Sequence, residues 1–196
     1  MMRIISQQEH VKSLHDKELV ETAKLKVYHL DAIKFLENID GQFDGVIIDF
    51  PDPNSPELSK LYSLRFYELL RRKLNRTGMW VQQSSSPFFA KEAFLMIGRT
   101  MRQSLPAVVA YRQFIPSFGE WGFWLGSSFH RDADRLLKHV NSLEQIEVDT
   151  SYLDMRKMQA NFVFSSKEMY SRDKRINTMT SMALFNRYLE GWEKYF

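Results

Sequence analysis

A short apolar run that ends in an acid, with a second acid three residues later, does most to restrict how this chain can fold. Residues 45–49 read Gly-Val-Ile-Ile-Asp and the next four read Phe-Pro-Asp-Pro, which places Asp49 and Asp52 in one short segment. Continuous β-branched runs are typical of buried strands in parallel sheets. Open α/β sheets bind ligands at the carboxyl ends of such strands. The segment therefore predicts an α/β fold with two carboxylates at its ligand-binding edge, where they would attract a cationic amine or deprotonate one.

The composition is that of an ordinary globular protein. Of the residues, 44% are hydrophobic and 26% are charged, as is usual for such proteins. The length of 196 residues predicts a single domain over residues 1–196. The absence of cysteine excludes disulfides, thiolate metal sites and cysteine nucleophiles. The five histidines are not spaced as metal ligands with nearby acids, so no metal site is expected.

Neither a membrane nor a nucleic acid is indicated as a partner. The N-terminal residues lack the apolar core of a signal peptide, and no apolar run approaches the length of a membrane span. We therefore expect a cytoplasmic protein without membrane insertion. The net charge of +3 is weakly basic, and its densest cationic cluster is expected on a solvated helix face. That cluster comprises Arg71, Arg72, Lys73 and Arg76.

Strands and helices are expected to alternate along the chain. The pattern predicts strands at 25–30, 45–49, 79–83, 107–115 and 121–127, and helices at 8–23, 31–39, 61–74 and 86–101. The last two strands should form an antiparallel hairpin, because the connection between them is too short for a parallel crossover. A loop is expected from the second strand to about Lys60, a turn at Gly78, and mostly helix after His130.

Polar side chains gather at one rim of this predicted sheet. Each ends a strand, follows one or lies in a loop beside one: Asp31, Asp49, Asp52, Gln83 and Glu120. An acid after a strand often only caps the next helix, and this interpretation stays open for Asp31. Asp52 has no evident helix to cap and is the stronger functional candidate. The sequence contains no glycine-rich dinucleotide loop, P-loop or nucleophile elbow.

Three stretches resemble the spermidine synthase (aminopropyltransferase) family in order and spacing. They read DGVIIDFPDPNSPELSKLYSLRFYELLRRKL, GMWVQQSSSPFF and IPSFGEWGFWLGSS. The likeness is greatest to the domains of this type that follow membrane-spanning segments in some bacterial proteins. It implies a Rossmann-like fold with a mostly parallel sheet and a C-terminal antiparallel hairpin. It also implies polyamine biosynthesis: an aminopropyl group passes from the co-substrate decarboxylated S-adenosylmethionine to an amine, and methylthioadenosine is released.

The resemblance implies roles for three acids. Asp52 matches the general base that takes a proton from the attacking amine, and Asp49 matches the acid that binds an amino group beside the transfer centre. Asp31 matches the acid that accepts a hydrogen bond from the adenine amino group. Two fixed carboxylates would also attract both cationic reactants and align them for displacement.

The implied amine site departs from the family pattern in one position. Gln83 matches a residue that lines the amine channel. Where the family usually has a tyrosine in the hairpin loop, this chain has Phe118, so Glu120 would supply the polarity that holds the amine. Alternatively, Phe118 and Trp121 only pack the hairpin.

The larger departure concerns the cofactor half of the family. Its glycine-rich loop and its ribose-binding acid should precede Val27, where the sequence is mostly polar. The implied sheet then lacks its first two strands, which are central ones, and backbone groups would be left unpaired. We therefore expect a rearranged sheet, or strands supplied by a second copy in a homo-oligomer or by a partner chain.

Several functions stay open on the sequence alone. The first is an aminopropyltransferase that acts on a small amine. The second is an inactive relative that serves as a binding or interaction module. The third is an α/β domain with an interaction role, whose exposed edge strand pairs with a partner. A methyltransferase that uses S-adenosylmethionine is a further alternative, because it shares the core of the fold.

Overall fold

The structure is a computed structural model that describes residues 26–117, 119–146 and 150–195. The chain divides into two compact units, Met1–Asp31 and Ala32–Phe196, and each is described by itself. In the first unit the described residues, 26–31, form neither helix nor strand, so the strand expected over 25–30 is wrong for them. Their apolar side chains are exposed and no ladder of hydrogen bonds holds the backbone extended. The helix expected over 8–23 lies outside the described residues.

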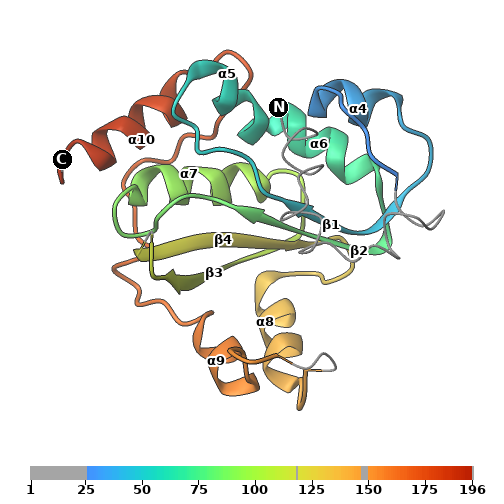
Figure 1. Ribbon diagram of the computed structural model, residues 1–196, viewed down its shortest axis with the longest axis vertical. Helices are drawn as coiled ribbons and strands as arrows, with labels where there is room; N and C mark the ends of the chain where they lie inside the picture. Colours follow the sequence, from blue (N-terminus) through green and yellow to red (C-terminus); the bar gives the residue numbers. More distant parts are fainter. Residues whose placement is uncertain (1–25, 118, 147–149, 196) are drawn as a thin grey trace, which may run out of the picture. The chain divides into compact units, whose positions relative to one another are not determined.

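Four strands of the second unit form one mixed sheet (Figure 1). They are β1 (Phe43–Ile48), β2 (Leu74–Gln83), β3 (Ala107–Ile115) and β4 (Gly119–Ser127), in the order β1-β2-β4-β3. Strands β1 and β2 run parallel, whereas β4 is antiparallel to both of its neighbours, which confirms the predicted hairpin. One of the three strand pairs in the described sheet is parallel, so this sheet is mixed, where a mostly parallel one was expected. Gly78 was expected in a turn but lies inside β2, where the register with β1 shifts as it does at a β-bulge.

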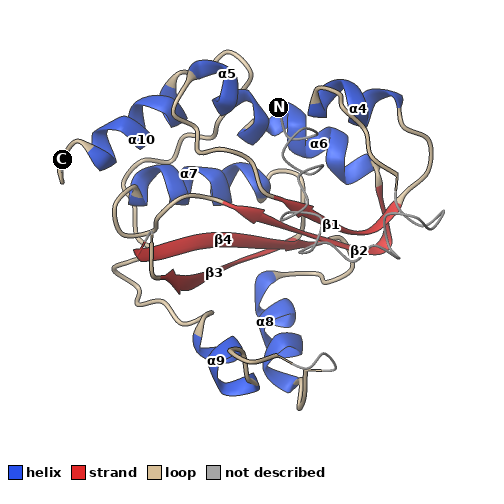
Figure 2. Ribbon diagram, in the orientation of Figure 1, coloured by secondary structure: helices blue, strands red, loops and turns tan. Residues whose placement is uncertain are grey.

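Helices cover one face of this sheet, and two more lie on the other (Figure 2). The first face carries α4 (Ala32–Asn38), α5 (Pro56–Ser59), α6 (Leu64–Arg72), α7 (Lys91–Met101) and α10 (Ala183–Trp192). The second carries α8 (Ala133–Ser142) and α9 (Met155–Ala160). No helix of the described residues is long and apolar enough to cross a membrane.

The segment after β1 is more structured than its sequence suggested. The loop expected up to Lys60 contains α5, because Ser55 caps it by accepting a hydrogen bond from the Leu58 amide and Pro56 occupies the first turn. The single helix expected over 61–74 is instead a short 3₁₀ turn followed by α6. Ser63 separates them: its backbone is extended, and its hydroxyl caps α6 at the Phe66 amide.

The main core lies between the sheet and the first helical layer. Its largest fully buried side chains include Trp80, Trp124, Tyr62, Tyr67 and Phe94. The indole of Trp124 stacks on Phe94 and donates a hydrogen bond of 2.9 Å to the Phe94 carbonyl. Helix α7 can approach this indole because residue 98 is glycine, where a Cβ would lie 2.2 Å from the ring. Helix α7 is thereby seated directly on β4.

A buried asparagine ties the C-terminal segment to this layer. The side chain of Asn177 donates to the Ser59 carbonyl at 2.7 Å, and its backbone amide donates to the Thr100 hydroxyl at 2.9 Å. Its own carbonyl accepts from the Leu64 amide at 2.9 Å. Three elements therefore meet at one residue, and the chain continues from there into α10, which lies beside α5 and α7 (Figure 1).

The opposite face of the sheet is covered unevenly. Leu136 of α8 packs against Ala107 and Val109 under β3, in a small second core. Among the described residues β1 pairs with β2 alone, and the side chain of Ile47 in β1 is 85% exposed. The described sheet therefore ends in an apolar edge at β1.

Candidate functional site

Two carboxylates border a hollow at the carboxyl end of β1. Asp49 and Asp52 lie in the loop that follows this strand, and both line a cavity of about 580 Å³ together with Gln83 at the end of β2. The remaining walls are mostly apolar and include side chains from all four strands: Ile47, Val81, Ile115, Tyr111 and Phe123. Asp49, Asp52 and Gln83, which the sequence placed at one rim, are thus brought together.

The loop between the two acids is held from beneath. The hydroxyl of Tyr62, a side chain with no solvent exposure, donates a hydrogen bond of 3.0 Å to the Pro51 carbonyl. The ring of Phe50 packs edge-on against Tyr62 and against Phe66 of α6. The Asn54 amide also closes a tight turn onto the Asp52 carbonyl at 2.7 Å. A loop anchored in this way presents its carboxylates in a defined geometry.

Asp52 is the centre of a hydrogen-bond network. The Gln83 amide nitrogen donates to Asp52 Oδ1 at 2.8 Å, and the Ser85 hydroxyl donates to Asp52 Oδ2 at 3.0 Å. Gln83 is oriented in turn by the Tyr62 hydroxyl, which lies 3.4 Å from its Oε1. The orientation of this amide follows from these partners, because only the nitrogen can donate to a carboxylate.

Burial and the negative charge of the site both raise the pKa of two nearby tyrosines. Burial raises the pKa of Tyr62 well above its usual range, and the charges of Asp52 and Asp49 raise it further. Burial also raises the pKa of Tyr188, with a second contribution from Asp52, beside which its hydroxyl lies. Both phenols therefore stay protonated and act as donors near these carboxylates.

Asp49 differs from Asp52 in its surroundings. Its side chain is exposed, whereas Asp52 is half-buried. Among the described residues no hydrogen bond to the Asp49 carboxylate is found, whereas Asp52 accepts from Gln83 and Ser85 and has the Tyr188 hydroxyl beside it. The Asp49 carboxylate is therefore more accessible to a ligand in the hollow than the Asp52 carboxylate.

Of the other predicted site residues, Glu120 belongs to the same described unit as this cluster and does not join it. Glu120 forms an ion pair of 3.2 Å with Arg112 and does not line the hollow. Arg112 also pairs with Glu168 at 2.5 Å. Phe118 lies outside the described residues, and Asp31 is an exposed residue of the other unit. Glu120 is thus engaged by a cation of its own chain.

Three contributors were missed by reasoning from the sequence. Tyr62 and Ser85 lie within the motifs quoted above, but no pattern indicates that their hydroxyls point toward the Asp52 loop. Tyr188 belongs to α10, far along the chain, and reaches Asp52 only because α10 packs on the helical layer. Within the described part of the chain, no group of three or more His, Asp or Glu side chains could hold a metal ion.

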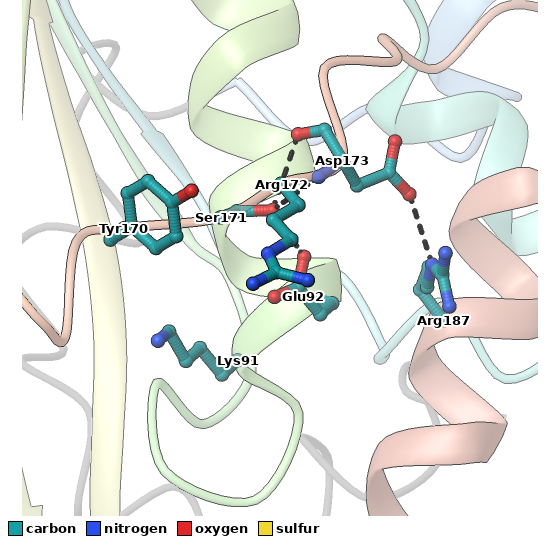
Figure 3. A pocket seen from close by; sticks show the side chains of 7 residues that line it. All are labelled: Lys91, Glu92, Tyr170, Ser171, Arg172, Asp173 and Arg187. Atoms are coloured by element: carbon teal, nitrogen blue, oxygen red, sulfur yellow. Dashed lines mark hydrogen bonds and ion pairs between the residues drawn. The ribbon is translucent and has the colours of Figure 1, made fainter.

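A second hollow, of about 390 Å³, lies between α7, α10 and the segment that precedes α10 (Figure 3). Two of its charged lining residues, Asp173 and Arg187, pair with each other. Asp173 forms ion pairs with Arg175 at 2.6 Å and with Arg187 at 3.0 Å, and the Ser171 hydroxyl donates to Glu92 at 2.5 Å. These contacts attach the C-terminal segment to α7 and α10, so we assign the second hollow a structural role.

Comparison with known proteins identifies the relatives of this chain. Residues 4–134 match the family model "Spermine/spermidine synthase domain". Polyamine aminopropyltransferase 1 of Streptomyces coelicolor is 34% identical over 196 residues, which is 100% of this chain and 35% of that protein. The polyamine aminopropyltransferase of Leptospira interrogans is 32% identical over 188 residues, which is 94% of this chain and 35% of that protein. The chain thus spans about a third of the length of these relatives.

Solved structures show the same fold. A crystal structure of spermidine synthase in complex with the transition-state analogue AdoDATO matches with a TM-score of 0.69 and 18% identity, over 86% of this chain and 58% of that chain. Spermidine synthase from Thermotoga maritima matches with a TM-score of 0.64 and 16% identity, over 86% of this chain and 56% of that chain. The predicted Rossmann-like α/β fold is confirmed, and the narrower likeness to domains that follow membrane-spanning segments stays a prediction.

Proposed function

This chain belongs to the spermine/spermidine synthase family, and on that premise we propose that it transfers an aminopropyl group to an amine in polyamine biosynthesis. The donor is decarboxylated S-adenosylmethionine, used as a co-substrate, and the second product is methylthioadenosine. The observation that carries the proposal is the meeting of Asp49, Asp52 and Gln83 at one hollow beyond the carboxyl end of β1.

The proposed reaction is a displacement at a carbon bonded to the sulfonium sulfur. An ammonium group has no lone pair, so one carboxylate must first take a proton from the amine. The amine nitrogen then forms a bond to the carbon while the carbon–sulfur bond breaks, and the sulfur leaves as the neutral thioether of methylthioadenosine. Asp52 is assigned the role of base and Asp49 that of anchor for the amine. Their placement in one anchored loop supports both roles.

The apolar walls suit the methylene chain of an aliphatic amine. Tyr111 and Phe123 stack with their ring centroids 4.9 Å apart and line the hollow beside Ile115. Apolar side chains remove hydrocarbon from water, and aromatic faces attract a nearby ammonium group. Gln83 is engaged with Asp52, which supports a role in holding that acid in addition to lining the amine channel.

A further strand beside β1 is part of the proposal. The support is the edge position of β1 in the described sheet and the 85% exposure of Ile47. Edge strands present unpaired backbone groups that can pair with another chain. The added strand would come from a second copy or from a partner polypeptide. The same edge favours the second candidate function, an interaction module without transferase activity.

The test is a transfer assay on the purified chain with decarboxylated S-adenosylmethionine and a series of diamines, followed by chromatography of methylthioadenosine. Release that depends on the amine and is lost in Asp52→Asn would support the proposal. Asp134→Asn is the matched control, because it makes the same change at an exposed residue of α8. No release with any amine would reject transferase activity for this chain, and methyl transfer from S-adenosylmethionine would instead indicate a methyltransferase.

A further inference from the structure

Ser85 has the one left-handed backbone conformation found at a non-glycine residue in the described ranges, with φ of 63°. Its side chain is completely buried. For an L-residue this region brings Cβ close to the backbone, whereas glycine occupies it without strain. A strained residue that persists in a buried loop is a reason to ask what its side chain does.

The neighbouring backbone holds this conformation in place. The Ser84 amide donates to the Gly122 carbonyl at 2.9 Å, and the Gly122 amide donates to the Ser85 carbonyl at 2.7 Å. The next hydroxyl, that of Ser86, donates to the Glu120 carbonyl at 2.7 Å. A Cβ at residue 122 would lie 2.9 Å from Cδ of Pro87, so the close contact between this loop and β4 requires glycine there. These contacts with β4 fix the backbone of the segment that follows β2.

The Ser85 hydroxyl points at the base assigned above. It donates to Asp52 Oδ2 at 3.0 Å, while Gln83 donates to Asp52 Oδ1 at 2.8 Å. With one directed donor on each oxygen, both the position and the plane of the carboxylate are set. We propose that Ser85 is a positioning residue for Asp52, and that its strained backbone conformation is retained because it aims the hydroxyl at this carboxylate. The inference rests on the proposed function and adds a residue to it.

The two roles of Ser85 can be separated by substitution. Ser85→Ala removes the hydroxyl and keeps the backbone strain, whereas Ser85→Gly removes both. We expect each variant to lower kcat about tenfold to a hundredfold with KM changed less than threefold, because a misplaced catalytic group costs rate more than binding. Ser85→Gly should nevertheless unfold at a urea concentration no lower than Ser85→Ala, since it relieves the strain.

Ser84→Ala is the matched control. It deletes a buried hydroxyl one residue earlier, which donates to the Gln82 carbonyl at 3.1 Å and does not contact Asp52. Its kcat should stay within about twofold of wild type. A Ser85→Gly variant with wild-type kcat, or an equal loss of kcat in Ser84→Ala, would overturn the proposal.

A double-mutant cycle measures the coupling between Ser85 and Asp52 without any activity. Urea unfolding is followed for wild type, Ser85→Ala, Asp52→Ala and the double variant. A hydroxyl that acts on Asp52 loses its effect once Asp52 is gone. The factor by which Ser85→Ala changes the unfolding equilibrium constant should therefore be about tenfold smaller in the Asp52→Ala background than in wild type. Additive effects, within about twofold, would overturn the proposal. A wild-type chain that transfers nothing would reject the proposed function instead, while the cycle still decides the contact.

Discussion

The amide of Gln83 donates a hydrogen bond of 2.8 Å to the carboxylate of Asp52, although the two residues stand 31 positions apart in the chain. The bond joins the end of β2 to the loop after β1. These ends are adjacent because β1 and β2 are parallel neighbours, with Ile48 opposite Gln82 in the register. The central contact of the site is therefore a consequence of parallel pairing.

Asp52→Asn should abolish amine-dependent release of methylthioadenosine while the protein stays folded. An amide cannot take the proton, and loss of a general base typically costs about 10² to 10⁴ in rate. The measurement is kcat together with the far-ultraviolet circular dichroism spectrum. Asp49→Asn tests the assignment of roles, because loss of the amine anchor should mainly raise KM. Undiminished turnover in Asp52→Asn would remove this residue from the mechanism.

Tyr62→Phe should destabilise the fold by about 1–2 kcal/mol, because the Pro51 carbonyl and Gln83 lose a buried donor. The phenyl ring keeps its packing against Phe50. The free energy of unfolding in urea measures this change. Tyr170→Phe is the control: it deletes a hydroxyl from an exposed side chain and should change stability by less than about 0.5 kcal/mol. Equal effects of the two changes would contradict the anchoring role of Tyr62.

Acid should weaken the contact between Glu168 and Arg112. The Ser165 amide and hydroxyl and the guanidinium of Arg112 lower the pKa of Glu168 from an ordinary 4.5 to about 2. A lowered pKa means that this carboxylate stabilises the fold above about pH 4.5, and that the contribution is lost as the pH falls toward 2. Because the Glu168 side chain is 40% exposed and its charge is screened by water, we expect a contribution of less than about 1 kcal/mol. Urea midpoints should fall less steeply over this range in Glu168→Gln than in wild type; identical slopes would contradict the assignment.

Methylthioadenosine should bind the chain if the nucleoside site is present, and Asp31→Ala should weaken that binding. The expected loss is about tenfold, the usual value of a hydrogen bond to a charged group. Isothermal titration calorimetry measures it, with Asp40→Ala, an exposed acid elsewhere, as the control. Binding that is unchanged in Asp31→Ala would leave this residue as no more than a helix cap. No binding at millimolar ligand would mean that this chain alone does not form the nucleoside site.

A charge at the β1 edge should reduce association. Ile47→Lys places an ammonium group on an apolar edge strand, and natural proteins protect edges from pairing in this way. Sedimentation equilibrium should show a mass that rises with concentration for wild type and rises less for Ile47→Lys. Met79→Lys, a similar change at an exposed residue of β2, is the control. A wild-type protein that is monomeric at every concentration would reject a second copy as the source of the added strand.

Local patterns were sufficient for some elements and insufficient for others. The hairpin followed from the short connection between two apolar runs, and it was confirmed. The expected strand over 25–30 also has strand-like residues, but residues 26–30 are not a strand in the structure. Strand propensity describes how well a side chain suits a sheet, whereas a strand forms only where a neighbour pairs with it. Gly78 was misjudged for the same reason, since its place inside β2 depends on the bulge against β1.

By itself, the sequence determined the α/β class, the hairpin and the grouping of Asp49, Asp52 and Gln83 at one rim, because each depends on the order and periodicity of nearby residues. Tertiary structure decided which donors reach Asp52. Ser85 does so through a backbone conformation set by pairing with Gly122, and Tyr188 does so because α10 packs on the helical layer. It also decided that Glu120 pairs with Arg112 and does not line the hollow. Such contacts join residues far apart in sequence, so their geometry is set by packing and by backbone pairing, which no local pattern encodes.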